Sequence, residues 1–382
     1  MLTIIGFAAL AVTAVAHAGT LAIAAVRLLR RPKRPDFGDK PPAVSILRPM
    51  KGLENHLEEC VATSFRLTYP RYEVIFCIED EDDDAVPMVR RLMAAHPSVD
   101  ARLIFGRERV GANPKLNNLV KGWHAAKHDW IVMSDSNALL PPDYVEGLLV
   151  RWGADTGVVS TAAAVTRPEG FAAALECAFM NALQARWVLA ADSVGMGYAL
   201  GKTLMYRRAA LDALGGLPRL AEQAAEDIAS THVMREAGLG IRLAQQPVRQ
   251  PIGRRRLAEV WQRQVRWARL RRSGLKPIYA AELLSGGALP MAIAAALTVA
   301  GAVPVAAALG FAVLWYGAET AVTAAVGWPV SWRTPFALVL RDLLLPAVWV
   351  GGWIGNRFEW RGQVMTVSPS GRRAIGAEAT DG

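Results

Sequence analysis

The motif with the clearest chemistry in the chain is Asp135-Ser136-Asn137. Asp135 and Asn137 stand two residues apart after an apolar run, so in an extended segment both side chains point the same way. Carboxylate and amide oxygens suit a hard cation, and the pair therefore predicts a site for Mg²⁺ or Mn²⁺ against a diphosphate. An ordinary Asp/Asn turn is the alternative, and Asn137, which is neutral, is a weaker ligand than a second carboxylate.

Two further carboxylate groups occupy positions suited to ligand binding or proton transfer. Asp80 ends an apolar run within an acidic stretch. It can accept a hydrogen bond from a nucleoside, or it belongs to a solvated loop whose charges favour a helix start. Glu226-Asp227 precedes a helix predicted over 228–236. A carboxylate there is either a helix cap or a general base that takes a proton from a hydroxyl, and spacing does not choose between them.

Basic residues lie where they can meet phosphate groups. Lys115 stands in the first turn of a predicted helix, whose N–H groups attract anions, although taken alone the pattern favours an ordinary surface lysine. Lys51 follows a predicted strand. The amphipathic helix predicted over 257–276 places Arg263 and Arg266 opposite an apolar face, which is typical of a helix lying along a bilayer. This apolar face comprises Leu257, Val260, Trp261, Val265 and Ala268. The basic run adjoins apolar segments and not a nucleic-acid-binding motif, so we expect no nucleic-acid partner.

Strand and helix patterns alternate through the middle of the chain. Strands are expected at 43–47, 73–78, 101–105 and 130–134, and helices at 55–65, 85–95 and 114–126. Short β-rich runs separated by helices of about ten residues indicate βαβ units and a mostly parallel sheet. Ligands of such sheets bind beyond the carboxyl ends of the strands, so Lys51, Asp80 and Asp135 should meet at one edge.

The N-terminal segment predicts a membrane anchor. Residues 1–27 are long and apolar enough to cross a bilayer, and 28–42 form a basic, Pro-rich linker. Positive flanks stay cytoplasmic, so the N-terminus should lie outside and the following domain inside. A cleaved signal peptide is the alternative, but the stretch lacks a basic start and continues past Ala16-His17-Ala18.

The C-terminal region is apolar again. Residues 283–355 predict transmembrane or re-entrant helices, with either two spans or a tight helical hairpin before 327. The last apolar segment contains Arg341 and Asp342, which are costly in lipid unless paired or facing protein, so its depth stays open. Residues 356–382 are expected to form a polar tail.

Composition narrows the class of protein. Of 382 residues, 52% are hydrophobic and 20% charged, which excludes a disordered chain. The mean hydropathy is +0.20 and the formal net charge is +9, a balance that points to anionic partners such as a membrane surface or a phosphorylated substrate. Three cysteines are too few for a disulfide framework.

The order of these motifs between an N-terminal span and a C-terminal apolar region resembles the ceramide glucosyltransferases, which are membrane glycosyltransferases with a GT-A catalytic domain. The resemblance runs from about Val44 to Leu270 and implies an α/β, Rossmann-like catalytic domain over 43–256. The stretches that carry it are Val44–Gly52, Tyr69–Val74, Val99–Leu103, Gly111–Leu119, Gly170–Ala173 and the Arg263-Gln264-Val265-Arg266-Trp267 motif.

The resemblance also implies roles for individual residues. Asp80 matches the family aspartate that contacts the nucleotide, with Lys51 and Lys115 on the same nucleotide-sugar. Asp135 matches the aspartate that helps to bind the metal–diphosphate, and Asp227 matches the catalytic base. Arg263, Arg266 and Trp267 match a motif near the diphosphate and the acceptor entrance. Many related transferases carry an acidic residue in place of Asn137, which leaves metal dependence open.

The activity implied is inverting transfer of a hexose, with glucose favoured, from a UDP-sugar to the primary hydroxyl of ceramide. UDP-galactose and UDP-glucuronic acid are alternative donors. Transfer of N-acetylglucosamine to a hopanoid lipid and a catalytically silent membrane adaptor are the rival functions. We expect a multi-pass protein of the bacterial inner membrane, with its catalytic domain in the cytoplasm and with donor, lipid acceptor and bilayer as partners.

Overall fold

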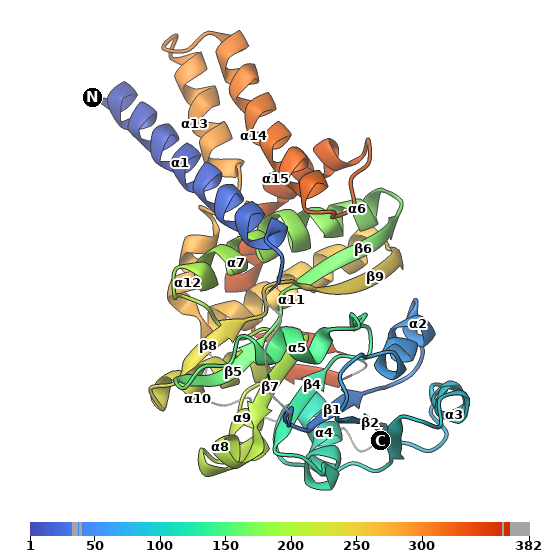
Figure 1. Cartoon of the computed structure of the whole chain (residues 1–382). Helices are drawn as coiled ribbons and strands as arrows, with labels where there is room; N and C mark the ends of the chain where they lie inside the picture. The colour runs from blue at the N-terminus through green and yellow to red at the C-terminus, as the bar shows by residue number, and fades with distance from the viewer. Residues whose placement is uncertain (33–36, 38–39, 361–362, 367–382) are drawn as a thin grey trace. The chain divides into compact units, whose positions relative to one another are not determined.

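The predicted alternation of strands and helices forms a seven-stranded sheet in the computed structural model, which describes residues 1–32, 37, 40–360 and 363–366 (Figure 1). The strand order is β3-β2-β1-β4-β7-β5-β8, and β7 is antiparallel to both of its neighbours whereas the other pairs are parallel. The strands are β1 (Val44–Pro49), β2 (Tyr72–Cys77), β3 (Asp100–Ile104), β4 (Trp130–Ser134), β5 (Thr156–Ser160), β7 (Thr203–Arg207) and β8 (Gly240–Leu243). The prediction of an α/β fold with a mostly parallel sheet is confirmed.

The chain divides into two compact units, which we call the sheet unit and the helical unit. The sheet unit comprises Pro32–Ala163, Met196–Pro251 and Asn356–Gly382, and the helical unit comprises Met1–Arg31, Ala164–Gly195 and Ile252–Gly355. Residues 33–36 and 38–39 of the predicted linker lie outside the described residues. The predicted tail beyond 366 does so too. The described part of that tail forms an antiparallel pair, β10 (Arg357–Trp360) with β11 (Gln363–Thr366).

The sheet unit contains the four predicted helices, with changed bounds, and three that were not predicted, α5, α8 and α9. The helices are α2 (Leu57–Ala62), α3 (Val86–Ala95), α4 (Pro114–Ala125), α5 (Tyr144–Leu149), α8 (Arg208–Ala213), α9 (Gly216–Ala221) and α10 (Glu226–Glu236). The helix predicted over 55–65 ends earlier and continues as a 3-10 turn at Thr63–Phe65. Every residue of β1 is buried, as expected for a strand whose sheet is covered on both faces.

Helix α4 packs very closely on the sheet, and Gly122 makes that approach possible. A Cβ atom at Gly122 would lie 2.5 Å from the Sγ atom of Cys77 on β2, a distance that real carbon–sulfur contacts do not reach. The close packing brings the first turn of α4, with Lys115, near the carboxyl edge of the sheet.

The helical unit contains the apolar segments predicted at both ends of the chain. Its helices are α1 (Leu2–Leu29), α6 (Phe171–Cys177), the π-helical η2 (Ala178–Ala185), α7 (Arg186–Ser193), α11 (Leu257–Gly274), α12 (Lys276–Glu282), α13 (Ala288–Val299), α14 (Val305–Ala325) and α15 (Thr334–Trp353). Among the described helices, α1, α14 and α15 are long and apolar enough to cross a membrane. Helix α13 has only 12 residues and forms a hairpin with α14, so the hairpin alternative fits better than two full spans. A two-stranded ribbon of β6 (Ala163–Glu169) and β9 (Val248–Arg254) completes the described strands.

Charged side chains buried among these apolar helices are paired. The carboxylate of Glu319 on α14 accepts hydrogen bonds from Arg186 (3.0 Å) and Arg341 (2.8 Å), and Arg341 also pairs with Asp342 (2.8 Å). All four side chains are almost completely buried. Arg341 and Asp342 therefore meet the condition under which ionisable residues are tolerated in an apolar segment, and the pairing explains how charges are accommodated in α15.

The variant Glu319→Gln should destabilise the helical unit by about 3–5 kcal/mol, because it leaves two buried guanidinium groups with too little negative charge. The measurement is the midpoint of thermal unfolding in detergent. Glu222→Gln is the matched control, since Glu222 forms an exposed pair with Arg219. Equal midpoints for the two variants would contradict the role given to Glu319.

Candidate active site

Four chain segments meet at the carboxyl edge of the sheet. Strands β1, β2 and β4 end together, because their parallel register pairs Pro49 with Cys77 and Leu47 with Met133. Strand β7 runs the other way, so its first residue, Thr203, pairs with Ser134, the last residue of β4. The turn before β7 therefore reaches the same edge as the polar residues that follow β4.

Lys115 is the centre of the side-chain network at this edge. The side chain of Asn113 caps α4 by accepting hydrogen bonds from the N–H groups of Lys115 and the following residue, which fixes Lys115 in the first turn. The Nζ atom of Lys115 lies 2.6 Å from Asp135 Oδ1, 2.6 Å from Glu226 Oε1 and 2.8 Å from the carbonyl of Gly201. Burial alone would lower the pKa of Lys115, but the two carboxylates outweigh it and raise this pKa above its ordinary value.

The second oxygen of Asp135 contacts another lysine. Lys202 Nζ lies 3.0 Å from Asp135 Oδ2 and donates a hydrogen bond of 2.7 Å to Asn137 Oδ1. Asn137 in turn donates to Glu54 (2.8 Å). Burial opposes ionisation of Asp135, but Lys115 and Lys202 together hold the pKa of its carboxyl well below its ordinary value. The side chain of Asp135 is therefore a carboxylate that forms ion pairs with two ammonium groups.

Asp227 is built into the start of α10, which begins two residues earlier than predicted. Its carboxylate accepts hydrogen bonds from the N–H groups of Ile228 (2.8 Å) and Gly201 (3.0 Å). Burial, and then the negative charge of Glu226, raise the pKa of Asp227 to about 7. A carboxyl whose pKa is raised on folding contributes stability that is complete below its unfolded pKa and is lost as the pH rises through about 7. A pKa of about 7 suits a general base that works at neutral pH.

The residues predicted to hold a metal do not fit a divalent cation in this arrangement. Both carboxylate oxygens of Asp135 and the side-chain oxygen of Asn137 already receive ammonium groups. Over the described ranges, no group of three His, Cys, Asp or Glu side chains is placed to hold a metal ion. A cation between Asp135 and Asn137 would have to displace Lys202.

Asp80 and Lys51 lie on exposed loops after β2 and β1. These loops are joined, because the N–H of Gly52 donates to both carboxylate oxygens of Asp83 (3.0 and 2.9 Å). Asp83 also accepts from the N–H of Ala85 just before α3, in agreement with the helix-start explanation of the acidic run. The two predicted nucleotide contacts therefore stand on adjoining, solvent-facing loops.

Two residues that position this edge were not identified from the sequence. Arg48 is fully buried in β1 and donates to the carbonyls of Asp135 (3.1 Å), Ser136 (2.8 Å) and Ala138 (3.0 Å), which shapes the loop after β4. A charged residue inside an apolar strand was the available signal. Lys202 is the other, and nothing local in the sequence indicates its contact with Asp135.

The Arg263–Trp267 motif lies on α11 in the helical unit. Arg263 pairs with the buried Glu176 (2.7 Å), and its guanidinium lies over the Trp267 ring at 5.8 Å. The predicted apolar face of α11 is divided between the protein interior and its surface. Val260, Val265 and Ala268 are buried, whereas Leu257 and Trp261 are exposed. The buried side includes Gln264, because α11 packs against α6 and α15 along a line shifted from the predicted stripe.

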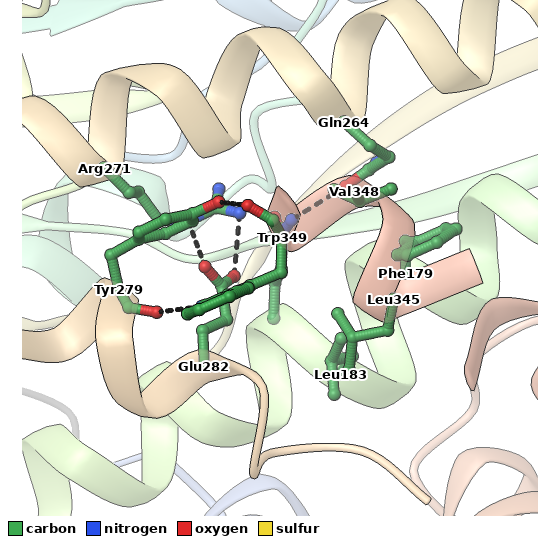
Figure 2. Close-up of a pocket in the computed structure, with 10 residues that line it drawn as sticks. Phe179, Leu183, Gln264, Arg271, Tyr279, Glu282, Leu345, Val348 and Trp349 are labelled. Carbon is green, nitrogen blue, oxygen red and sulfur yellow. Dashed lines mark hydrogen bonds and ion pairs between the residues drawn. The ribbon is translucent and has the colours of Figure 1, made fainter. Parts of the chain in front are cut away.

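A small open depression lies among α11, α12, α15 and η2 within the helical unit (Figure 2). One part of its wall is apolar, with Phe179, Leu183, Leu345 and Val348. The other part is polar: Arg271 pairs with Glu282 (2.7 Å), and Gln184 donates to Gln264 (3.1 Å). The depression thus presents both an apolar and a polar surface.

The fold agrees with that of solved glycosyltransferases. A mannosyltransferase from Pyrobaculum calidifontis, PcManGT, was solved in complex with GDP-Man and Mn²⁺. It matches with a TM-score of 0.51 and 20% sequence identity, over 90% of this chain and 99% of that one. The likeness establishes the GT-A type of α/β fold, as predicted.

The family follows from the sequence match. The model of glycosyl transferase family 21 matches residues 7–373, and the chain belongs to this family. Two similar proteins are from Caenorhabditis elegans. Ceramide glucosyltransferase 3 is 31% identical over 245 residues, which are 64% of this chain and 53% of that protein. Ceramide glucosyltransferase 1 is 29% identical over 236 residues, 60% and 50% of the two chains. The chain spans about half the length of these curated relatives.

Proposed function

We propose that the protein transfers a hexose, with glucose favoured, from a UDP-sugar to the primary hydroxyl of ceramide with inversion at the anomeric carbon. The observation that carries the proposal is Asp227, a half-buried carboxyl with a pKa of about 7, beside a cluster of cationic side chains at the carboxyl edge of the sheet. Membership of glycosyl transferase family 21 and the similar ceramide glucosyltransferases support transfer of glucose and ceramide as the acceptor.

The donor is proposed to lie over the strand ends. Asp80 and Lys51, on the exposed loops, contact its nucleoside side, and Lys202 faces its diphosphate, with the charge of Lys115 close behind it. Cationic groups there stabilise the UDP leaving group, because negative charge builds up on it as the bond to the sugar breaks.

The acceptor step is a direct displacement. Asp227 takes the proton from the ceramide hydroxyl while the oxygen attacks the anomeric carbon and UDP leaves with the bonding electrons. The two backbone N–H groups that bind Asp227 hold its carboxylate in a fixed orientation. The proton on Asp227 then passes to solvent, which restores the base for the next cycle.

The lipid is proposed to enter from the membrane at the depression lined by α11, α12 and α15 (Figure 2). A ceramide has apolar chains and a polar headgroup, which suit the two kinds of wall there. Three helices able to cross a membrane support a multi-pass protein. Orientation with the sheet unit in the cytoplasm, in a bacterial inner membrane, is part of the proposal and rests on the positive flank after α1.

Purified protein in detergent with ceramide and a single donor should yield a hexosylceramide, detected by mass. UDP-glucose, UDP-galactose, UDP-glucuronic acid and UDP-N-acetylglucosamine are supplied separately.

Asp227→Asn should lower turnover about 10²- to 10⁴-fold, because the general base is lost. Asp155→Asn, which alters an exposed pair with Arg242, is the matched control and should keep full turnover.

Other outcomes separate the rival functions. Product with a hopanoid and UDP-N-acetylglucosamine, but not with ceramide, would replace the proposed acceptor. Absence of any product or donor turnover would support the silent adaptor. Nearly full activity of Asp227→Asn would show that another group takes the proton.

The acid limb of the kcat/KM profile should fall near pH 7, since this parameter reports the pKa of the free enzyme's base. Glu226→Gln should move the limb to lower pH, because it removes the negative charge that disfavours ionisation of Asp227. Glu222→Gln, on the surface, should leave it in place. An unchanged limb in Glu226→Gln would mean that Asp227 is not the titrating group.

A further inference from the structure

Lys202 occupies the position at which the sequence predicts a metal ion. Its Nζ atom lies between Asp135 Oδ2 (3.0 Å) and Asn137 Oδ1 (2.7 Å), the two oxygens of the predicted metal motif. Mg²⁺ and Mn²⁺ bind oxygen at about 2.0–2.2 Å, so such a cation and this ammonium exclude each other. The ammonium supplies a positive charge at the same place.

The sheet itself holds Lys202 there. Antiparallel pairing of β4 with β7 sets Ser134 opposite Thr203, and the N–H of Asp135 donates to the carbonyl of Lys202 (3.1 Å). The Lys202 side chain is only 17% exposed, so its ammonium is held by these neighbours instead of moving freely in water. Asn137 is fixed from the other side by Glu54.

Hydrogen-bond capacity distinguishes the two lysines of the network. An ammonium group has three N–H donors. The three N–H donors of Lys115 point to Asp135, Glu226 and the carbonyl of Gly201. Lys202 contacts two side-chain oxygens among the residues that the structure describes, which leaves a third donor for a ligand. Lys115 therefore positions the carboxylates, and Lys202 is the lysine able to bind an oxyanion.

We propose that Lys202 binds the diphosphate of the nucleotide-sugar in place of a divalent cation, so that donor binding needs no metal. The inference rests on the proposed function, since it requires a nucleoside diphosphate donor at this edge. Asp135 and Asn137 orient the ammonium instead of ligating a metal. The neutral Asn137 agrees with this role, because a monovalent ammonium needs less negative charge around it than a divalent ion does.

The test is UDP binding to the full-length protein in detergent, measured by calorimetry in EDTA and again in Mn²⁺. Wild-type protein should bind with the same affinity in both. Lys202→Met should bind about 10- to 100-fold more weakly in EDTA, the range of one charge-assisted hydrogen bond. Lys127→Met is the matched control and should bind as wild type, because Lys127 forms an exposed pair with Asp100 at the amino ends of the strands.

A second variant keeps the test independent of a folding defect. Lys202→Met combined with Asn137→Asp places two carboxylates at the site with no ammonium between them, so UDP binding should become dependent on Mn²⁺. Thermal unfolding of each variant checks that the fold persists.

The outcomes separate the inference from the function on which it rests. Wild-type binding that EDTA abolishes and Mn²⁺ restores would overturn the role of Lys202 while leaving the proposed donor intact. Unchanged UDP affinity in a folded Lys202→Met protein would overturn it as well. No UDP binding in either condition would contradict the proposed donor itself, and the inference would fall with it.

Discussion

The arrangement of the site depends on one buried cation, the ammonium group of Lys115. It joins the loop after β4, through Asp135, to the start of α10, through Glu226, and to the turn before β7, through the carbonyl of Gly201. Two carboxylates so close to each other and so little exposed would repel without it. The N-cap of Asn113 and the close packing of α4 at Gly122 set the position of that ammonium.

The antiparallel strand β7 adds the second constraint. In a wholly parallel sheet the start of this strand would lie at the opposite edge. Its reversal brings Gly201 and Lys202 to the carboxyl edge, where Gly201 binds Asp227 and Lys202 binds Asp135. Any side chain at Gly201 would crowd Glu226, the neighbour of the proposed base, since a Cβ there would lie 2.9 Å from Glu226 Oε1. One strand direction thus connects the proposed base with the proposed diphosphate site.

Local patterns in the sequence were sufficient for much of this. The run at 130–134 predicted β4 with the bounds that the structure has, and the strand-end argument placed Asp135 at the carboxyl edge of the sheet. What local patterns lacked was long-range pairing. The contact of Lys202 with Asp135 depends on the partner and direction of β7, and the buried face of α11 depends on its packing against α15. The metal site was predicted from Asp135 and Asn137 alone. The sequence did not show that pairing of β4 with β7 places the ammonium group of Lys202 between them.

The same division holds for the apolar segments. Length and hydropathy predicted the N-terminal span and an apolar C-terminal region whose number of spans stayed open, and the structure has α1, α14 and α15 as the described helices able to cross a membrane. These sequence properties did not show that Glu319 compensates both Arg186 and Arg341, because these residues are far apart in the chain. Buried charges of this kind explain how a segment with Arg341 and Asp342 remains a continuous helix.

The central claim is that a carboxylate base drives a single displacement on the nucleotide-sugar. Its most direct measurement is the anomeric configuration of the lipid product, read from proton NMR couplings after reaction with α-linked UDP-glucose. A single displacement predicts a β-linked sugar. An α-linked product would contradict the account, since retention requires a mechanism other than attack by the acceptor hydroxyl from the face opposite UDP.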